Sequence, residues 1–171
     1  MRLRRWILIV PVIVVMGCRG ERGSTDAAGS MRMEDRTAAE QSVRGFMGRV
    51  AQDVTLGGPT AWSKEFADGP DFFMASEGTL VFSSGAAAAQ GIPALMQFIK
   101  KIELRWGQHL RVDPLTADFA MVGTSYQEVR GDAQGHEITE KGYFTGLAEK
   151  QDGTWKFRDA HWSVAPAAKA P

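Results

Sequence analysis

The sequence predicts an α+β domain in which one cone-shaped, curved antiparallel sheet wraps around three helices. Apolar residues at helical spacing occur in three stretches before residue 103. From Leu104 to Val164 the pattern changes to β-rich runs separated by turn residues. Helices placed ahead of and between strands, followed by long antiparallel strands, are typical of this class. A cone of this kind leaves an opening at its wide end, where we expect a pocket.

The three helices are predicted from caps, breakers and apolar stripes. The first begins at Thr37, which has the spacing of a capping box with Glu40. Gly57-Gly58-Pro59 ends it and starts a short second helix, and Gly91-Ile92-Pro93 starts the third. The three apolar stripes are Ala39, Val43, Phe46, Val50 and Val54; Trp62 and Phe66; and Ile92, Leu95, Met96, Ile99 and Ile102.

Six strands are predicted. Two short runs around Glu77-Gly78 form a hairpin, and four longer runs follow after the third helix. The six strands are expected over 72–76, 79–83, 104–112, 119–129, 138–150 and 154–164.

The last hairpin turns at Asp152-Gly153, a pair typical of a two-residue type I′ turn. This turn would place Ala148 opposite Phe157, Gly146 opposite Asp159, and Phe144 opposite His161. Strict alternation would also give one sheet face the side chains Trp155, Phe157, Asp159, His161 and Ser163. We therefore expect this strand to start in the core and to end at the mouth of a pocket.

Residues 1–17 have the pattern of a secretory signal peptide: Arg2, Arg4 and Arg5 precede a ten-residue apolar run. That run is short for a transmembrane helix. Val15-Met16-Gly17-Cys18 then resembles a bacterial lipobox, in which the cysteine becomes the lipidated first residue. The alternative is an ordinary signal peptide followed by a stray thiol.

Under the lipobox interpretation, Cys18 carries acyl chains such as palmitate, which are sufficient for stable anchoring. Residues 18–35 form a flexible tether, residues 36–165 the domain, and residues 166–171 a loose tail. Arg19 stands where an aspartate would retain the protein at the inner membrane. We therefore expect a location on the periplasmic face of the outer membrane.

The charge balance argues against nucleic acid as a partner, since basic and acidic residues number 20 each. Without the three leader arginines the chain keeps 17 basic residues and is mildly acidic. Cys18 is the only cysteine, so no intramolecular disulfide can form.

The order of elements resembles the nuclear-transport-factor-2-like superfamily in its SnoaL-like branch. The resemblance covers roughly residues 37–165 and is most specific in the last third. The matching stretches are Phe66-Ala67-Asp68, Gly91-Ile92-Pro93-Ala94-Leu95, Ala120–Tyr126, Lys141–Thr145 and Asp152–Ser163.

The resemblance implies a conical α+β barrel, often dimeric, with a pocket between the sheet and the long helix. It does not imply one function, because this fold hosts isomerases, dehydratases, cyclases and binding proteins. The ketosteroid isomerases of the superfamily carry an aspartate base on the strand after the second helix. Here that strand has no acid before Glu77 at the turn, so this base is absent or displaced to Glu77.

Three side chains are candidates for chemistry. Asp159 and His161 lie two residues apart on one predicted strand face, where a carboxylate could orient an imidazole general base. The alternative is a histidine that is hydrogen-bonded within the sheet. Tyr126 could present its hydroxyl to a ligand or be a core aromatic with a wet tip.

The predicted pocket lining combines these candidates with apolar residues. It consists of Trp62, Phe73, Phe98, Trp106, Val122, Tyr126, Phe144, Phe157, Asp159 and His161. Neither His109 nor His136 completes a metal-ligand spacing, so no metal and no cofactor is expected.

Three functions remain open from the sequence. The first is an envelope lipoprotein that binds a small, largely apolar molecule. The second is an enzyme, of dehydratase, cyclase or hydrolase type, that uses His161 and Asp159 as an acid–base pair. The third is a structural module of the envelope that forms a homodimer or docks through its exposed sheet face.

Overall fold

The structure, a computed structural model, describes residues 31–166 of the chain. The predicted signal peptide, Cys18 and residues 167–171 of the predicted tail lie outside the described residues. The helical segments are α1 (Met33–Gly57), the 3-10 turn η1 (Gly58–Ala61), α2 (Trp62–Glu65) and α3 (Gly85–Leu95). The strands are β1 (Phe73–Ser76), β2 (Thr79–Phe82), β3 (Lys101–Trp106), β4 (Arg111–Pro114), β5 (Phe119–Gly131), β6 (Glu137–Gln151) and β7 (Thr154–Val164).

The long helix α1 buries the predicted stripe, from Ala39 to Val54. Its start is earlier than the sequence predicts, so residues 33–35 of the expected tether are helical. Thr37 does not cap the helix, because its hydroxyl donates a hydrogen bond to the carbonyl of Met33 at 3.0 Å. Two acidic residues in the first turn complement the helix dipole instead. No helix in residues 31–166 is long and apolar enough to cross a membrane.

Helix α3 begins six residues before the predicted start. The hydroxyl of Ser84 accepts a hydrogen bond from the backbone N–H of Ala87 at 3.1 Å and so caps the helix. The alanines after Gly85 have the highest helix propensity, and Pro93 falls in the last turn rather than the first. As a consequence, Met96, Ile99 and Ile102 of the predicted stripe lie beyond Leu95, the last residue of the helix.

All seven strands belong to one sheet, in the order β2-β1-β7-β6-β5-β3. Strand β4 also pairs with β5, on the same edge as β3 but nearer the start of β5. The predicted strand over 104–112 is therefore divided into β3 and β4. The expectation of a wholly antiparallel sheet is wrong in one place, since β1 pairs with β7 in parallel. These two strands are far apart in the sequence, so no hairpin forces them to run in opposite directions.

Strand β7 has the predicted bounds but not the predicted faces. Asp152 and Gly153 have φ values of 49° and 80°, which confirms the type I′ turn, and Ala148 pairs with Phe157. The register then shifts by one residue at Arg158, so that Asp159 pairs with Leu147. This β-bulge places two successive residues opposite one and reverses the alternation beyond it.

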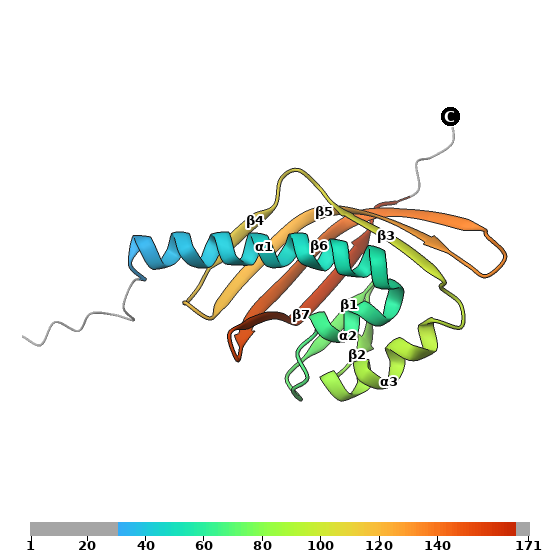
Figure 1. The fold of residues 1–171 in the computed structure, drawn as a ribbon, viewed down its shortest axis with the longest axis horizontal. Helices are drawn as coiled ribbons and strands as arrows, with labels where there is room; N and C mark the ends of the chain where they lie inside the picture. Colours follow the sequence, from blue (N-terminus) through green and yellow to red (C-terminus); the bar gives the residue numbers. More distant parts are fainter. Residues whose placement is uncertain (1–30, 167–171) are drawn as a thin grey trace, which may run out of the picture. The chain divides into compact units, whose positions relative to one another are not determined.

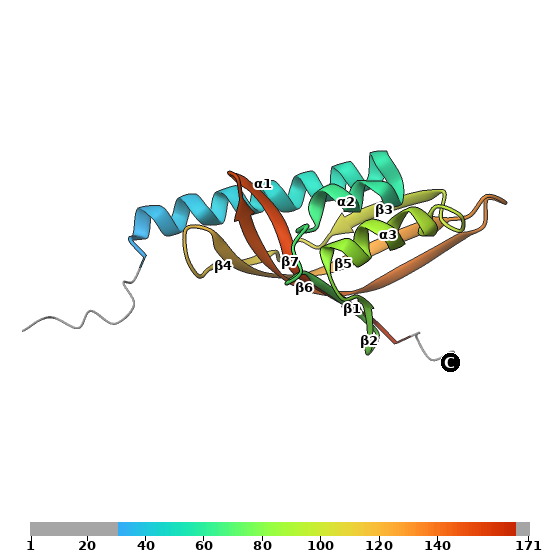
Figure 2. The ribbon, with the colours of Figure 1, turned by 90° about the horizontal axis from the view of Figure 1, so that it is seen from below.

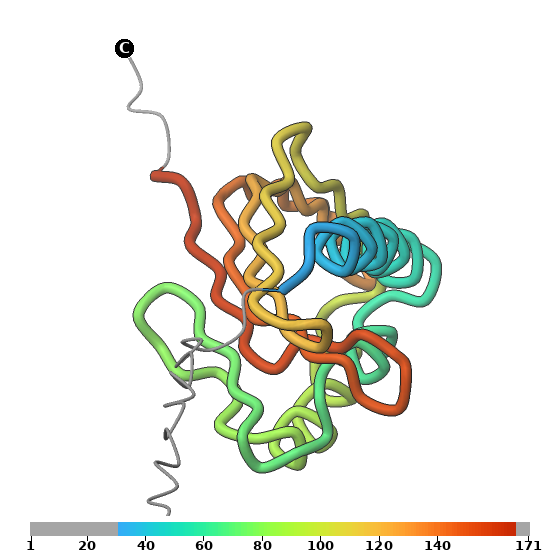
Figure 3. The backbone as a smooth tube through the Cα atoms, turned by 90° about the vertical axis from the view of Figure 1, so that its left-hand side faces the viewer, coloured from blue at the N-terminus to red at the C-terminus, as the bar shows by residue number. Residues whose placement is uncertain are grey.

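The sheet curves around α1, and α1, α2 and α3 all lie on its inner side (Figures 1, 2 and 3). The rings of Phe46 in α1 and Phe157 in β7 meet with centroids 4.8 Å apart. Phe144, Ala148, Trp155 and Phe157 are all buried on the inner face, whereas Tyr143 is exposed. The inner face of the sheet and the helices thus share one hydrophobic core.

Candidate functional site

A cavity of about 250 Å³ lies between the inner face of the sheet and the segments α2 and α3. It is lined from η1, α2, α3, the β1–β2 hairpin and the strands β3, β5, β6 and β7. This volume is just below the range of about 300–1,000 Å³ that is usual for ligand sites. The cavity therefore suits a small molecule.

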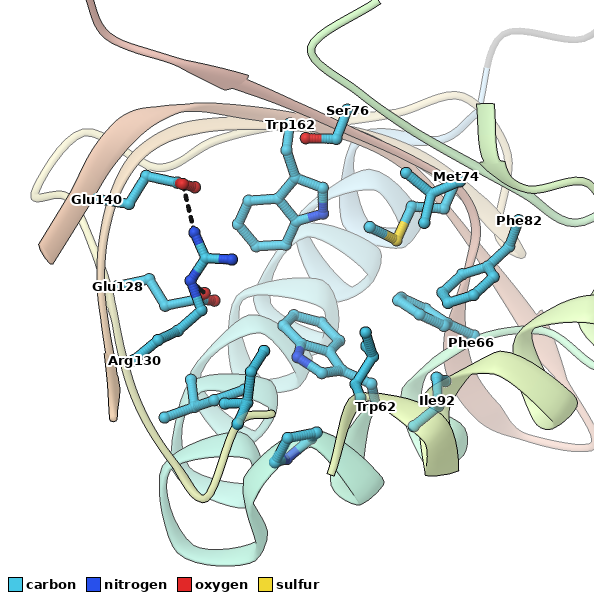
Figure 4. A pocket seen from close by; sticks show the side chains of 15 residues that line it. Trp62, Phe66, Met74, Ser76, Phe82, Ile92, Glu128, Arg130, Glu140 and Trp162 are labelled. Atoms are coloured by element: carbon cyan, nitrogen blue, oxygen red, sulfur yellow. Dashed lines mark hydrogen bonds and ion pairs between the residues drawn. The ribbon is translucent and has the colours of Figure 1, made fainter. Parts of the chain in front are cut away.

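One wall of the cavity carries three charged side chains (Figure 4). Arg130 lies between two carboxylates: its Nε is 3.1 Å from Glu128 Oε1, and its Nη2 contacts Glu140 Oε2. The hydroxyl of Tyr126 donates a hydrogen bond to the other oxygen of Glu140 at 2.9 Å. Both oxygens of Glu140 are thus engaged, as is one oxygen of Glu128.

The strand register explains why these groups meet. Glu128 of β5 and Glu140 of β6 are direct cross-strand partners, an arrangement that repulsion between like charges disfavours. Arg130 follows Glu128 by two residues, so its side chain lies on the same face and can offset both charges. Burial is the main cause that raises the pKa of Glu128, and Glu140 adds to it, while Arg130 opposes the shift.

The remaining lining is aromatic or aliphatic. Figure 4 shows Trp162 and Trp62 reaching into the middle of the cavity from opposite sides, and Phe66, Phe82 and Met74 facing the charged wall. The two indole rings pack edge to face with centroids 5.6 Å apart. The arrangement can hold an apolar body against indole and benzyl rings while polar atoms meet the charged wall.

Of the ten predicted pocket residues, Trp62 lines this cavity. Phe73 and Phe98 are exposed, at 42% and 71%, and do not contribute to it. Val122, Phe144 and Phe157 are buried core residues.

Trp106 does not line the cavity, but it stacks on Trp162, which does. The Nε1 of Trp106 donates a hydrogen bond to the carbonyl of Met47 at 2.7 Å. Tyr126 does not line the cavity, but it contacts two residues that do: its hydroxyl bonds to Glu140, and its ring packs against Trp162.

The proposed pair of Asp159 and His161 lies apart from the cavity. The bulge turns Ala160 and Trp162 inward, so His161 is exposed on the outer face and pairs with Thr145 rather than Phe144. Gly146 likewise pairs with Ala160 rather than Asp159. The prediction that Phe157, Asp159 and His161 share one face is therefore wrong.

Glu77 does not reach the cavity either. Its side chain accepts a hydrogen bond from the backbone N–H of Val164 and so closes the β1–β2 turn against β7. Within residues 31–166, no group of three or more His, Cys, Asp or Glu side chains could hold a metal ion.

The charged wall, formed by Glu128, Arg130 and Glu140, is not among the residues predicted from the sequence, although the residue pattern of β5 indicates part of it. Val122, Thr124 and Tyr126 alternate along β5, and all three side chains are buried on its inner face. Continued by two residues at a time, the same alternation points Glu128 and Arg130 inward.

No protein-family model and no curated protein matches the sequence. Solved structures do resemble the chain. A candidate scytalone dehydratase from Novosphingobium aromaticivorans has a TM-score of 0.66 at 12% identity and covers 77% of this chain and 87% of its own. A nuclear-transport-factor-2-like protein from Salmonella enterica serovar Typhimurium has a TM-score of 0.65 at 13% identity, covering 78% and 95%.

A hexachlorocyclohexane dehydrochlorinase, LinA type 3, from Novosphingobium barchaimii has a TM-score of 0.60 at 15% identity, covering 80% and 95%. Identities this low show the fold and leave the activity open. The chain has the cone-shaped α+β fold of the nuclear-transport-factor-2-like, SnoaL-like proteins.

Proposed function

We propose that this domain binds a small, largely apolar molecule in the cavity between the sheet and helices α2 and α3. The observation that carries the proposal is the composition of the lining: Trp62, Phe66, Phe82 and Trp162 surround a space with charge on one wall only. Clefts or cavities that are mostly apolar, with a few convergent polar groups, are the usual form of ligand sites.

Filling the cavity tests the proposal. Leu95 lines the cavity and is 37% exposed, so Leu95→Trp can add bulk without rebuilding the core. Met96 is 39% exposed and lies outside the lining, so Met96→Trp is the matched control. The probe is N-phenyl-1-naphthylamine, whose fluorescence rises in apolar surroundings.

We expect Leu95→Trp to weaken probe binding at least tenfold and Met96→Trp to leave it within twofold of the parent. All three proteins share the apolar run of residues 6–15, so any probe bound there contributes equally to each. Equal binding by the two variants would refute a ligand site in this cavity.

Elimination chemistry in the same cavity is a second candidate, favoured by the raised pKa of Glu128. Burial that raises the pKa of a carboxyl makes its carboxylate a stronger base. Glu128 would take a proton from a C–H group, the C–H electron pair would form a double bond, and chloride would leave from the next carbon. Chloride release from hexachlorocyclohexane that Glu128→Gln abolishes would support this candidate, and no release above the buffer rate would refute it.

We further propose that Cys18 anchors the protein to the envelope, on the periplasmic face of the outer membrane. The basic residues and apolar run ahead of Val15-Met16-Gly17-Cys18 support this placement. Cys18→Ser should abolish incorporation of radiolabelled palmitate in growing cells. Equal labelling of the variant and the parent would rule the anchor out.

A further inference from the structure

The charged wall and the aromatic lining together restrict the chemistry of the ligand. We propose that the ligand is a small apolar amine, bound as its ammonium ion between Glu128 and the indole rings of Trp62 and Trp162. The inference rests on the proposed binding function of this cavity and names the class of molecule that it takes.

The first argument is the charge of the lining. It contains two carboxylates and one guanidinium, a formal excess of one negative charge when both carboxyl groups are ionised. An anionic ligand would be repelled by Glu128 and Glu140, and Arg130 already neutralises part of the charge of both. A cationic ligand would remove the excess charge.

The second argument is the free hydrogen-bonding capacity. Glu140 accepts from Tyr126 through Oε1 and from Arg130 through Oε2. Among residues 31–166, Glu128 has an ion pair at Oε1 and no hydrogen bond at Oε2. No buried side-chain oxygen or nitrogen among the described residues lacks a partner, so this oxygen is open to the cavity, where a ligand can reach it. An ammonium group supplies the charged donor that this oxygen lacks.

The third argument is the aromatic lining. Cations bind over aromatic faces, and indole is the most favourable ring for this contact. The cation–π contacts in the part of the chain that the structure describes involve Phe46, Phe119 and Trp155. No cation of the described residues lies over Trp62 or Trp162. Each ring stacks one face on an aromatic neighbour, Trp62 on Phe66 and Trp162 on Trp106. Both rings reach into the cavity beside the charged wall, where a bound cation could meet the rest of their surface (Figure 4).

Three ligands of one skeleton test the inference: 1-naphthylmethylamine, 1-naphthalenemethanol and 1-naphthoic acid. Their binding to the full chain is measured by isothermal titration calorimetry at neutral pH. We expect the amine to bind at least tenfold more tightly than the alcohol, and the acid to bind most weakly. An alcohol or acid that matches or exceeds the amine overturns the inference and leaves the binding function standing.

Two variants test whether Glu128 is the residue that causes the preference for the amine. Glu128→Gln keeps the shape of the side chain and removes its charge, so the amine should lose its advantage while the alcohol binds as before. Glu103→Gln is the matched control, because Glu103 pairs with Lys101 outside the cavity lining. An advantage of the amine that survives Glu128→Gln overturns the assignment to Glu128.

The comparison of the three ligands on the parent needs no variant, so it decides the inference even if Glu128→Gln fails to fold. If none of the three binds while N-phenyl-1-naphthylamine does, the inference is overturned and the cavity remains a binding site. If that probe also fails to bind, both proposals are refuted.

Discussion

Trp162 gives the sharpest test of the bulge in β7. Strict alternation after Trp155 would put His161 in the core and Trp162 on the surface, whereas the register shift at Arg158 does the opposite. Trp162 is 7% exposed, and His161 beside it is exposed. Truncating each side chain to alanine therefore separates the two arrangements.

The expected loss at Trp162 follows from its contacts. Its ring packs at centroid distances of 4.7–5.8 Å against four others: Trp62, Trp106, Tyr126 and Phe144. Removing a buried tryptophan costs about 3–5 kcal/mol of unfolding free energy. Aromatic pairs contribute about 0.5–1.5 kcal/mol each beyond their buried area, which favours the upper end. His161→Ala should change stability by less than about 0.5 kcal/mol, as surface substitutions do.

Urea unfolding of the full chain, followed by far-ultraviolet circular dichroism, measures both variants without relying on tryptophan fluorescence. Trp162→Ala should shift the midpoint to much lower urea at an unchanged slope, and His161→Ala should overlay the parent. A loss below about 1 kcal/mol for Trp162→Ala, with a larger loss for His161→Ala, would show that the faces of β7 are assigned backwards.

Two further predictions concern other parts of the domain. Glu65 is 4% exposed, and its pKa is raised mainly by burial and then by the charge of Asp53. The protonated side chain therefore stabilises the fold at pH values below the unfolded-state pKa. This stabilisation is lost as the pH rises through the folded-state pKa. The stability of Glu65→Gln relative to the parent should therefore increase from pH 4 to pH 8 in urea titrations, and a constant difference would contradict the shift. Gly142→Ala should lower the unfolding free energy by at least about 3 kcal/mol, the upper end of the usual cost of overpacking. The reason is that the added Cβ would lie 1.9 Å from the carbonyl oxygen of Ser163. Gly48→Ala in α1, with nothing within 4 Å, should stabilise by about 0.5–1 kcal/mol, and thermal melts in which the two variants move together would refute the contrast.

The parts of the fold that the sequence predicts well are those set by local chemistry. Asp152-Gly153 determines a turn in which both residues have positive φ, and β7 then has the predicted bounds, Thr154–Val164. The stripe of α1 is likewise visible in the apolar spacing from Ala39 to Val54. These features depend on residues that are neighbours in the chain.

The parts that were predicted wrongly depend on tertiary contacts. Arg158 carries no residue signal for a bulge, and the parallel pairing of β1 with β7 joins segments that no local pattern connects. The start of α3 is a different case, because Ser84 and the alanines after it are a readable cap and helix. Pro93 is equally compatible with a first helical turn, and that interpretation places the start of the helix six residues too late.

The charged wall shows why a site can be missed even where the pattern is visible. A strand that alternates inward through Thr124 and Tyr126 is expected to keep charged residues off that face, because burying them is costly. Here Glu128 continues the inward phase and stands directly opposite Glu140, and one guanidinium is shared between them. Replacing such a group by packed apolar residues often leaves a protein no less stable, so folding alone gives little reason for a charged wall inside an apolar cavity. A bound molecule with a charged hydrogen-bond donor does give such a reason. The preference for an amine that we expect at Glu128 is the measurable consequence.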